Sequence, residues 1–279
     1  ELVVVSTAIE DTVAEVVKAK QLNIPILKRS EVLSLIAKSK KTIAVGGTSG
    51  KSTTSAMLFD ILQYAKMQPS IISGAGLTRI IKEGKIGNAK VGAGEWLVIE
   101  ADESDGSIVQ YHPEIGLLLN IDKDHQEIDE LMSIFGIFKN NSKKFIVNQS
   151  NTLAKQLSQN IKNDFASDEN SEAGYIAKDF TQNGFCISFI IHNSTFIINS
   201  IGKHNMENAL AAITVACQIG VDLETCASAL KTYEGIYDLF IEGNFEQAFA
   251  EKKKADSLYG NNYWTPQLLY IEAVYHIKQ

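Results

Sequence analysis

The sequence predicts an α/β protein built around a parallel sheet, with a short helical tail at its C-terminal end. Two observations support this fold class. Hydrophobic strand segments alternate with amphipathic helical segments from residue 2 to residue 148, a pattern typical of parallel α/β units. A glycine-rich turn joins the strand at 42–46 to a helix that starts at residue 51. With 45% hydrophobic and 21% charged residues among 279, the chain can also bury substantial cores.

The elements follow one another at a regular pitch. The N-terminal part predicts strands at 2–9 and 24–27, a helix at 12–22, and a second helix at 30–40 that Ser30 caps. The next part predicts strands at 42–46, 69–73, 96–101, 115–120 and 144–148, and helices at 51–66 and 127–141. Residues 74–95 are dotted with glycine and predict a hairpin or a mobile loop over the sheet. From residue 174 strands joined by turns are expected, and then helices at 204–219 and 223–233.

The C-terminal tail differs from the rest of the chain. Residues 237–279 are aromatic and charged, and they show no strand pattern. Gly243, Phe245, Ala248 and Ala255 stand at the intervals of a tetratricopeptide hairpin, although an ordinary pair of terminal helices fits equally well. Because one such repeat cannot bury its own apolar face, we expect the tail to pack on the main body or on a protein partner.

Charge and composition narrow the classes of function. The formal charge of −7 argues against broad binding of nucleic acids or anionic membranes, and it leaves room for a local site for a phosphorylated ligand. No apolar run approaches the ~20 residues of a membrane span, and the first residues lack the features of a signal peptide. Cys186, Cys217 and Cys226 have no metal-ligand spacing and predict buried thiols in a reducing compartment. A cytoplasmic protein is therefore expected, and its start inside a strand suggests a fragment.

The strongest functional signal is the stretch GGTSGKSTT at residues 46–54. A strand before it and a helix after it are the context that a phosphate-binding loop requires, although Val45 stands where the general pattern has glycine. The N–H groups of such a turn point into one concavity, and the helix adds its positive end. The Lys51 ammonium suits β- and γ-phosphates, and the Ser52 hydroxyl suits Mg²⁺. The residues expected to bind the phosphates are Gly47, Thr48, Ser49, Gly50, Lys51, Ser52 and Thr53.

Carboxylates gather at the end of the strand at 96–101. They are Glu100, Asp102, Glu103 and Asp105. Such a group repels itself unless a cation compensates it, and Mg²⁺ prefers carboxylates together with substrate phosphates. A solvated acidic turn is the simpler interpretation of this segment alone, but a phosphate loop on a neighbouring strand favours a magnesium site.

A second polar group follows the strand at 115–120. It consists of Asn120, Asp122, Asp124 and His125. This is the same edge of the sheet, the carboxyl end of the strands, where open α/β sheets bind their ligands. A lone histidine is more often structural, but this position makes His125 a candidate to ligate a second metal ion or to contact a phosphate.

Four motifs in order resemble the Mur ligases: GTSGKSTT, EADESD, NIDKDH and GKHNMENALAA. Within that family the likeness is to the branch of UDP-N-acetylmuramate–L-alanine ligases and murein peptide ligases. The stretches VVVSTAIED and IPILKRSEVL resemble the end of that branch's N-terminal UDP-sugar-binding domain. The resemblance covers residues 1–236. It implies the C-terminal half of a partial, Rossmann-like UDP-sugar domain at 1–40 and a central ATP-binding Mur ligase domain at 41–236, with the TPR-like tail at 237–279 replacing a third domain.

The resemblance also implies a chemistry, ATP-dependent joining of an amino acid to the carboxylate of a UDP-N-acetylmuramate-type substrate in peptidoglycan biosynthesis or recycling. Its cofactors would be ATP and Mg²⁺, and an acyl phosphate would be the intermediate. By motif, Lys51 would bind the β- and γ-phosphates, Ser52 and Glu100 would hold one Mg²⁺, and His125 would serve a second metal. Asn205 and Asn208 would meet the nucleotide at its adenine, although helix capping is a simpler role for Asn205.

Three departures from the family pattern leave alternatives open. Ser49 stands where the branch usually has histidine, and Ser52 replaces a threonine but keeps the hydroxyl. The glycine loop that would grip the uridine diphosphate is expected upstream of Glu1. The helical tail follows Ile236 where the family continues into the domain that binds the amino acid. An ATP-binding module that acts through its tail, and a superfamily ligase with a non-murein substrate, are therefore alternatives to a complete ligase.

Overall fold

A computed structural model of the chain describes residues 1–6, 9–104, 106–123 and 127–235. Its central element is a sheet of six strands in the order β5-β4-β6-β3-β7-β8, parallel except for β5 at one edge. The strands are β3 (Lys41–Gly46), β4 (Ser70–Ile72), β5 (Ala89–Lys90), β6 (Trp96–Glu100), β7 (Ile115–Leu118) and β8 (Lys144–Val147). Because β3 lies between β6 and β7, the turn that follows it opens at the middle of the carboxyl edge.

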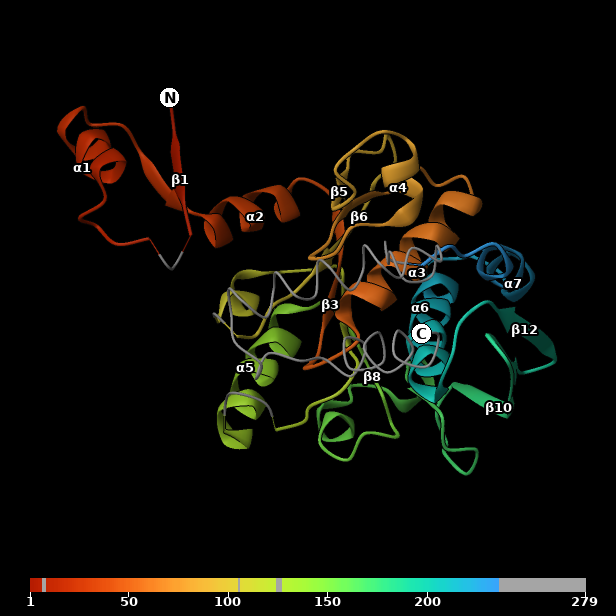
Figure 1. Ribbon diagram of the computed structural model, residues 1–279. Helices are drawn as coiled ribbons and strands as arrows, with labels where there is room; N and C mark the ends of the chain where they lie inside the picture. Colours follow the sequence, from red (N-terminus) through yellow and green to blue (C-terminus); the bar gives the residue numbers. More distant parts are fainter. Residues whose placement is uncertain (7–8, 105, 124–126, 236–279) are drawn as a thin grey trace, which may run out of the picture.

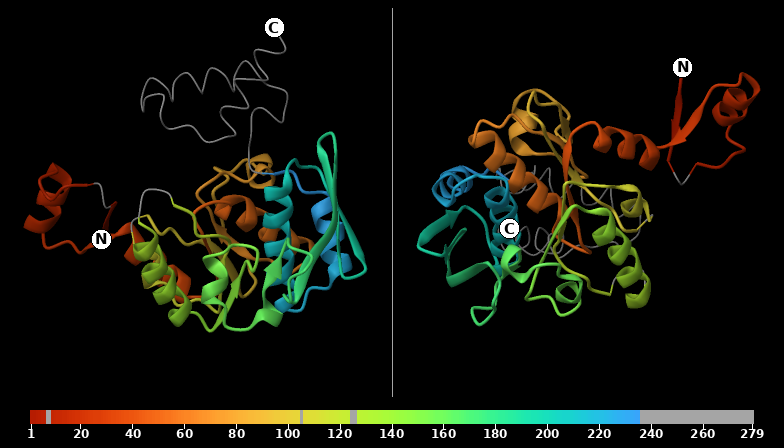
Figure 2. Two further views of the ribbon diagram at one scale, coloured as in Figure 1. Left: turned by 90° about the horizontal axis from the view of Figure 1, so that it is seen from below. Right: turned by 180° about the vertical axis from the view of Figure 1, so that it is seen from behind.

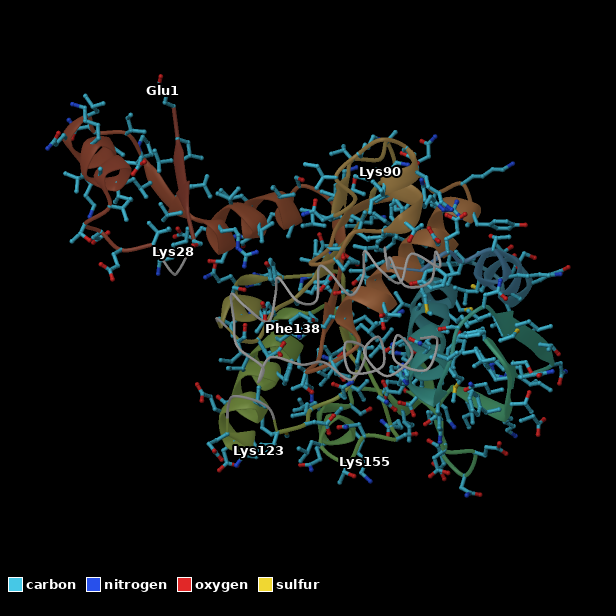
Figure 3. The ribbon with its side chains drawn as sticks, viewed as in Figure 1. Glu1, Lys28, Lys90, Lys123, Phe138 and Lys155 are labelled. Carbon is cyan, nitrogen blue, oxygen red and sulfur yellow. The ribbon has the colours of Figure 1, made fainter. Side chains whose placement is uncertain are left out.

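The two faces of the sheet are covered by separate apolar clusters. Ile43 and Val45 of β3 point to one cluster and Ala44 points to the other, as the alternation of a strand requires. The first face is covered by α3 (Lys51–Tyr64), with α6 (Lys203–Gln218) and α7 (Leu223–Lys231) packed on it. The second is covered by α5 (Ile128–Asn141) and the 3₁₀ turn η1 (Ser107–Gln110). Phe138 of α5, labelled in Figure 3, lies there. It meets Phe145 of β8 edge-on, with ring centroids 5.5 Å apart.

Helix α3 is buried on all sides over residues 54–62. It lies between the sheet and the pair α6 and α7, so an amphipathic pattern is not required of it (Figure 1). This position fixes the start of α3 rigidly beneath the turn after β3. The second sheet lies beyond α6 and α7, and its strands in spatial order are β12 (Ser194–Ile198), β11 (Cys186–Ile191), β10 (Tyr175–Asn183) and β9 (Phe165–Ala166). Two short 3₁₀ turns, η2 (Ala154–Leu157) and η3 (Ile161–Asn163), precede β9.

The N-terminal part lies apart from this body, and Figures 1 and 2 show it projecting to one side. It consists of a parallel pair, β1 (Val3–Val5) with β2 (Ile26–Lys28), and the helix α1 (Ala14–Gln21). Helix α2 (Arg29–Lys38) leads from it to β3. Leu2, Val4 and Leu22 are exposed here, in keeping with a part that buries little of its apolar surface.

Most of the expected elements are confirmed, with two differences. Ser30 does not cap α2: the helix begins at Arg29, and the Glu31 carboxylate accepts a 2.6 Å hydrogen bond from the Lys28 N–H. Residues 74–95 contain the short helix α4 (Thr78–Lys82) as well as β5, which pairs with β4. Cys226 is buried as expected, whereas Cys186 and Cys217 are only partly buried, and all three are free thiols.

Two predictions fall outside the described residues. They are the helical tail at 237–279 and the role of His125. The boundaries between the domains also stay predictions. Within the part of the chain that the structure describes, no helix has the length and apolarity needed to cross a membrane.

Candidate nucleotide site

The turn between β3 and α3 forms the candidate phosphate site. Gly47 has φ +136° and Gly50 has φ +84°, backbone conformations that residues with a side chain rarely adopt. Helix α3 begins at Lys51, directly after Gly50, and no side chain caps its first turn. The first N–H groups of a helix lack acceptors within the helix and carry partial positive charge, so this end is suited to an anion.

Lys51 folds back over this turn. Its ammonium donates to the Gly47 carbonyl at 2.7 Å and to the Glu103 carboxylate at 2.9 and 3.2 Å. Glu103 follows β6, the strand beside β3, so the sheet itself brings the two charges together. The ion pair is largely withdrawn from water, with the side chains of Lys51 and Glu103 only 17% and 8% exposed. The Glu103 carboxylate therefore holds Lys51 at the mouth of the candidate phosphate site. The sequence did not indicate that these two residues pair.

The two predicted magnesium ligands meet beside this lysine. The Ser52 hydroxyl donates to Glu100 Oε2 at 2.9 Å. The other oxygen of Glu100 accepts from the Ser73 hydroxyl at 2.6 Å and from the Gly74 N–H at 2.7 Å. Ser73 and Gly74 follow β4, so residues from three neighbouring strand ends fix the orientation of one carboxylate. A hydroxyl and an oriented carboxylate beside a phosphate site are a donor set that fits Mg²⁺.

Asn120 holds the far side of the loop. Its Oδ1 accepts from the Thr48 hydroxyl at 2.8 Å and from the Ser49 N–H at 2.9 Å, and its Nδ2 donates to the Ser49 carbonyl at 3.1 Å. The Thr48 hydroxyl also accepts from the Asp122 N–H at 3.2 Å. These hydrogen bonds tie Thr48 and the backbone of Ser49 to the strand end after β7, and they fix the shape of the loop.

The two asparagines of α6 differ in their surroundings. Asn208 is buried behind the loop, where its Oδ1 accepts from Thr54 at 3.3 Å and its Nδ2 donates to Asn205 Oδ1 at 3.4 Å. A Cβ at Gly50 would overlap Asn208 Oδ1 and lie 3.3 Å from Cγ. Asn205 is half-buried, one turn nearer the start of α6, and its Nδ2 donates to the Ile201 carbonyl at 2.9 Å. Asn208 thus supports the loop, and Asn205 does not cap the helix, because Gly202 is its N-cap.

Comparison with known proteins shows which family the chain belongs to. A family model described as the Mur ligase middle domain matches residues 45–216, more than half of the chain. The chain belongs to the Mur ligase family. A UDP-N-acetylmuramate–L-alanine ligase of Gloeothece citriformis is 33% identical over 255 residues, which make up 88% of this chain and 50% of that protein. The enzyme of the same name from Dictyoglomus turgidum is 36% identical over 249 residues, 85% of this chain and 53% of that protein.

Solved Mur ligase structures share the fold. The UDP-N-acetylmuramate–alanine ligase of Thermotoga maritima superposes with a TM-score of 0.75 at 24% identity, over 86% of this chain and 56% of that one. A second structure is a ligase from Neisseria meningitides that is named for UDP-N-acetylmuramate and L-alanyl-γ-D-glutamyl-meso-diaminopimelate. It superposes with a TM-score of 0.69 at 22% identity, over 85% of this chain and 80% of that one. The chain spans about half the length of the curated relatives it matches.

In this candidate site the structure gathers the turn between β3 and α3, Glu100 and Asn208 around the start of α3. Among the described residues no three metal-binding side chains cluster, and three members of the predicted polar groups, Asp105, Asp124 and His125, lie outside those residues. Asp102 is turned to its own segment, where Oδ1 accepts from the N–H and hydroxyl of Ser104. The role of Ser73 was not predicted, because a serine at a strand end carries no sequence pattern that marks it.

Proposed function

We propose that the Mur ligase middle domain of this chain binds ATP by its phosphate chain and uses it to activate a carboxylate. The observation that supports this most strongly is the uncapped start of α3, with Lys51 over it and the Ser52–Glu100 contact beside it. The helix end and the lysine each favour negative charge, and together they match a polyphosphate.

In the proposed reaction a carboxylate oxygen of the substrate attacks the γ-phosphorus of ATP, and the bond to the bridging oxygen of ADP breaks. An amine then attacks the acyl carbon, inorganic phosphate leaves, and the amine loses a proton. Lys51 and the N–H groups of α3 would stabilise charge on the phosphates, and Gly47 and Gly50 would let the backbone approach them. Ser52 and Glu100 would hold Mg²⁺, which when bound neutralises charge on the phosphates.

For the substrates we propose a UDP-N-acetylmuramate-type carboxylate and an amino acid or peptide amine, in peptidoglycan biosynthesis or recycling. The names of the relatives and structural neighbours support this class. Asn205, half-buried near the start of α6, is proposed to face the adenine, with Asn208 positioning the loop behind it. His125 is proposed to serve a second metal ion, on the strength of its motif alone.

The experiment is phosphate release from ATP with Mg²⁺ and UDP-N-acetylmuramate, measured with and without L-alanine and compared with the Lys51→Ala variant. Amino-acid-dependent release that is lost in the variant supports the ligase. Replacing L-alanine by L-alanyl-γ-D-glutamyl-meso-diaminopimelate distinguishes the two kinds of acceptor that the relatives' names contain. ATP binding without release would support the nucleotide site and contradict ligase activity of these 279 residues alone.

A further inference from the structure

The ammonium of Lys51 has no donor left for a ligand. A lysine carries three N–H donors, and here their acceptors are the Gly47 carbonyl and the two oxygens of Glu103, at 2.7, 3.2 and 2.9 Å. If the proposed function is right, the β- or γ-phosphate needs the same ammonium. A phosphate chain must therefore displace at least one of these acceptors.

We propose that Glu103 competes with the phosphate chain for Lys51: the carboxylate pairs with the ammonium until a polyphosphate binds, and phosphate oxygens then take its place. This inference rests on the proposed function and concerns the selectivity of the same site. A carboxylate that is only 8% exposed needs a cationic partner, because an unpaired buried charge is strongly unfavourable. An incoming phosphate repels the Glu103 carboxylate and does not repel the uncharged Gly47 carbonyl, so Glu103 is the acceptor that it would replace.

The two other carboxylates of this segment that the structure describes are engaged elsewhere. Glu100 accepts from Ser52, Ser73 and Gly74, and Asp102 accepts from Ser104. Of the described carboxylates, only Glu103 makes an ion pair with Lys51. The backbone of its segment is held by a hydrogen bond from the Gly106 N–H to the Glu103 carbonyl, and by one from the Ala101 N–H to Val45 in β3. Its side chain can therefore leave Lys51 while the main chain stays in place.

The exchange predicts a selectivity. A ligand that brings phosphate to Lys51 must outcompete Glu103, whereas a ligand that does not reach Lys51 is indifferent to it. Removing the charge of Glu103 should therefore tighten the binding of ADP, ATP and inorganic pyrophosphate and leave the binding of adenosine unchanged. The Glu103 carboxylate thus lowers the affinity of every ligand that contacts Lys51. Only ligands with several negative charges bind well enough to displace it.

The test is titration of the chain with ADP in EDTA, for the wild type, Glu103→Gln and the matched control Asp102→Asn. The control removes the same charge one residue away, and its side-chain oxygen can still accept from Ser104. Glu103→Gln should lower the Kd for ADP by about tenfold, equivalent to about 1.4 kcal/mol, and Asp102→Asn should change it much less. An unchanged or weaker affinity in Glu103→Gln would overturn the proposal.

The variant Lys51→Ala separates this inference from the proposed function. Lys51→Ala should lose ADP binding; if it binds like the wild type, the proposed function fails. If Lys51→Ala loses binding and Glu103→Gln equals the wild type, only the competition fails. If Glu103→Gln does not fold, Glu103→Asp replaces it, because this variant keeps the charge on a shorter side chain. Glu103→Asp should lower the Kd for ADP by a smaller factor than Glu103→Gln. An unchanged Kd would count against the exchange. Weaker binding of Glu103→Gln only in Mg²⁺ would instead identify Glu103 as a metal ligand.

Discussion

Gly50 is the position where a single methyl group should most disturb the nucleotide site. Its φ of +84° lies in the left-handed region, and a Cβ built there would overlap Asn208 Oδ1. Gly84 offers a matched control, because its φ of +77° is similar and a Cβ there would meet nothing within 4 Å. Comparing Gly50→Ala with Gly84→Ala therefore separates the contact with Asn208 from backbone strain.

The magnitudes follow from these contacts. A Cβ in the left-handed conformation costs about 1–2 kcal/mol, and both variants should lose this much stability. In Gly50→Ala the Asn208 side chain must also move away, which breaks its hydrogen bond with Thr54 and adds about 1 kcal/mol. For a protein of this size, the extra loss corresponds to a melting temperature about 2–4 °C lower than that of Gly84→Ala.

Urea unfolding and ADP titration of the same samples measure both effects. We expect Gly84→Ala to bind ADP like the wild type and Gly50→Ala to bind it much more weakly, because the loop and the start of α3 are displaced together. In a protein that already carries Asn208→Ala, the added methyl group of Gly50→Ala has no side-chain oxygen to displace. There Gly50→Ala should lower the free energy of unfolding only as much as Gly84→Ala does in the wild type. Equal stability and equal ADP affinity of Gly50→Ala and Gly84→Ala would refute this explanation of the glycine.

Two other predictions concern positioning and pH. Ser73→Ala removes a 2.6 Å hydrogen bond to Glu100. The affinity for ADP should therefore fall by about tenfold in Mg²⁺ and stay constant in EDTA. An equal fall in both buffers would show that Ser73 does not act through the metal site. Burial raises the pKa of Asp60 to about 6, although Arg79 Nε lies 3.1 Å from its carboxylate. Because this folded-state value lies above that of the unfolded chain, ionisation costs the folded protein on the order of 3 kcal/mol as the pH rises from about 4 to above 6. Relative to Asp60→Asn, the wild type should lose unfolding free energy over this range, and a constant difference between the two would contradict the shift.

The sequence was sufficient to predict the main body because local pattern and global fold agree there. The buried strand at Lys41–Gly46, the glycine turn and the helix from Lys51 each appear in the sequence as they do in the structure. The partner of Lys51 was not predictable, because which carboxylate of EADESD turns inward depends on the backbone after β6. Ser30 was misassigned for a similar reason, since the Glu31 side chain, which is also a common capping group, took the role of the cap.

Lys51 and the start of α3 are proposed to bind the phosphate chain of a nucleotide. The most direct test is equilibrium titration of the wild type, Lys51→Ala and Lys41→Ala with ATP and Mg²⁺. Lys41 is a suitable control because it begins β3, at the opposite end of the strand, and pairs with Glu95 at 2.9 Å. We predict that Lys51→Ala raises the Kd by about 10- to 100-fold, the loss expected for hydrogen bonds between charged groups, and that Lys41→Ala leaves it unchanged. Wild-type affinity in Lys51→Ala would contradict the claim.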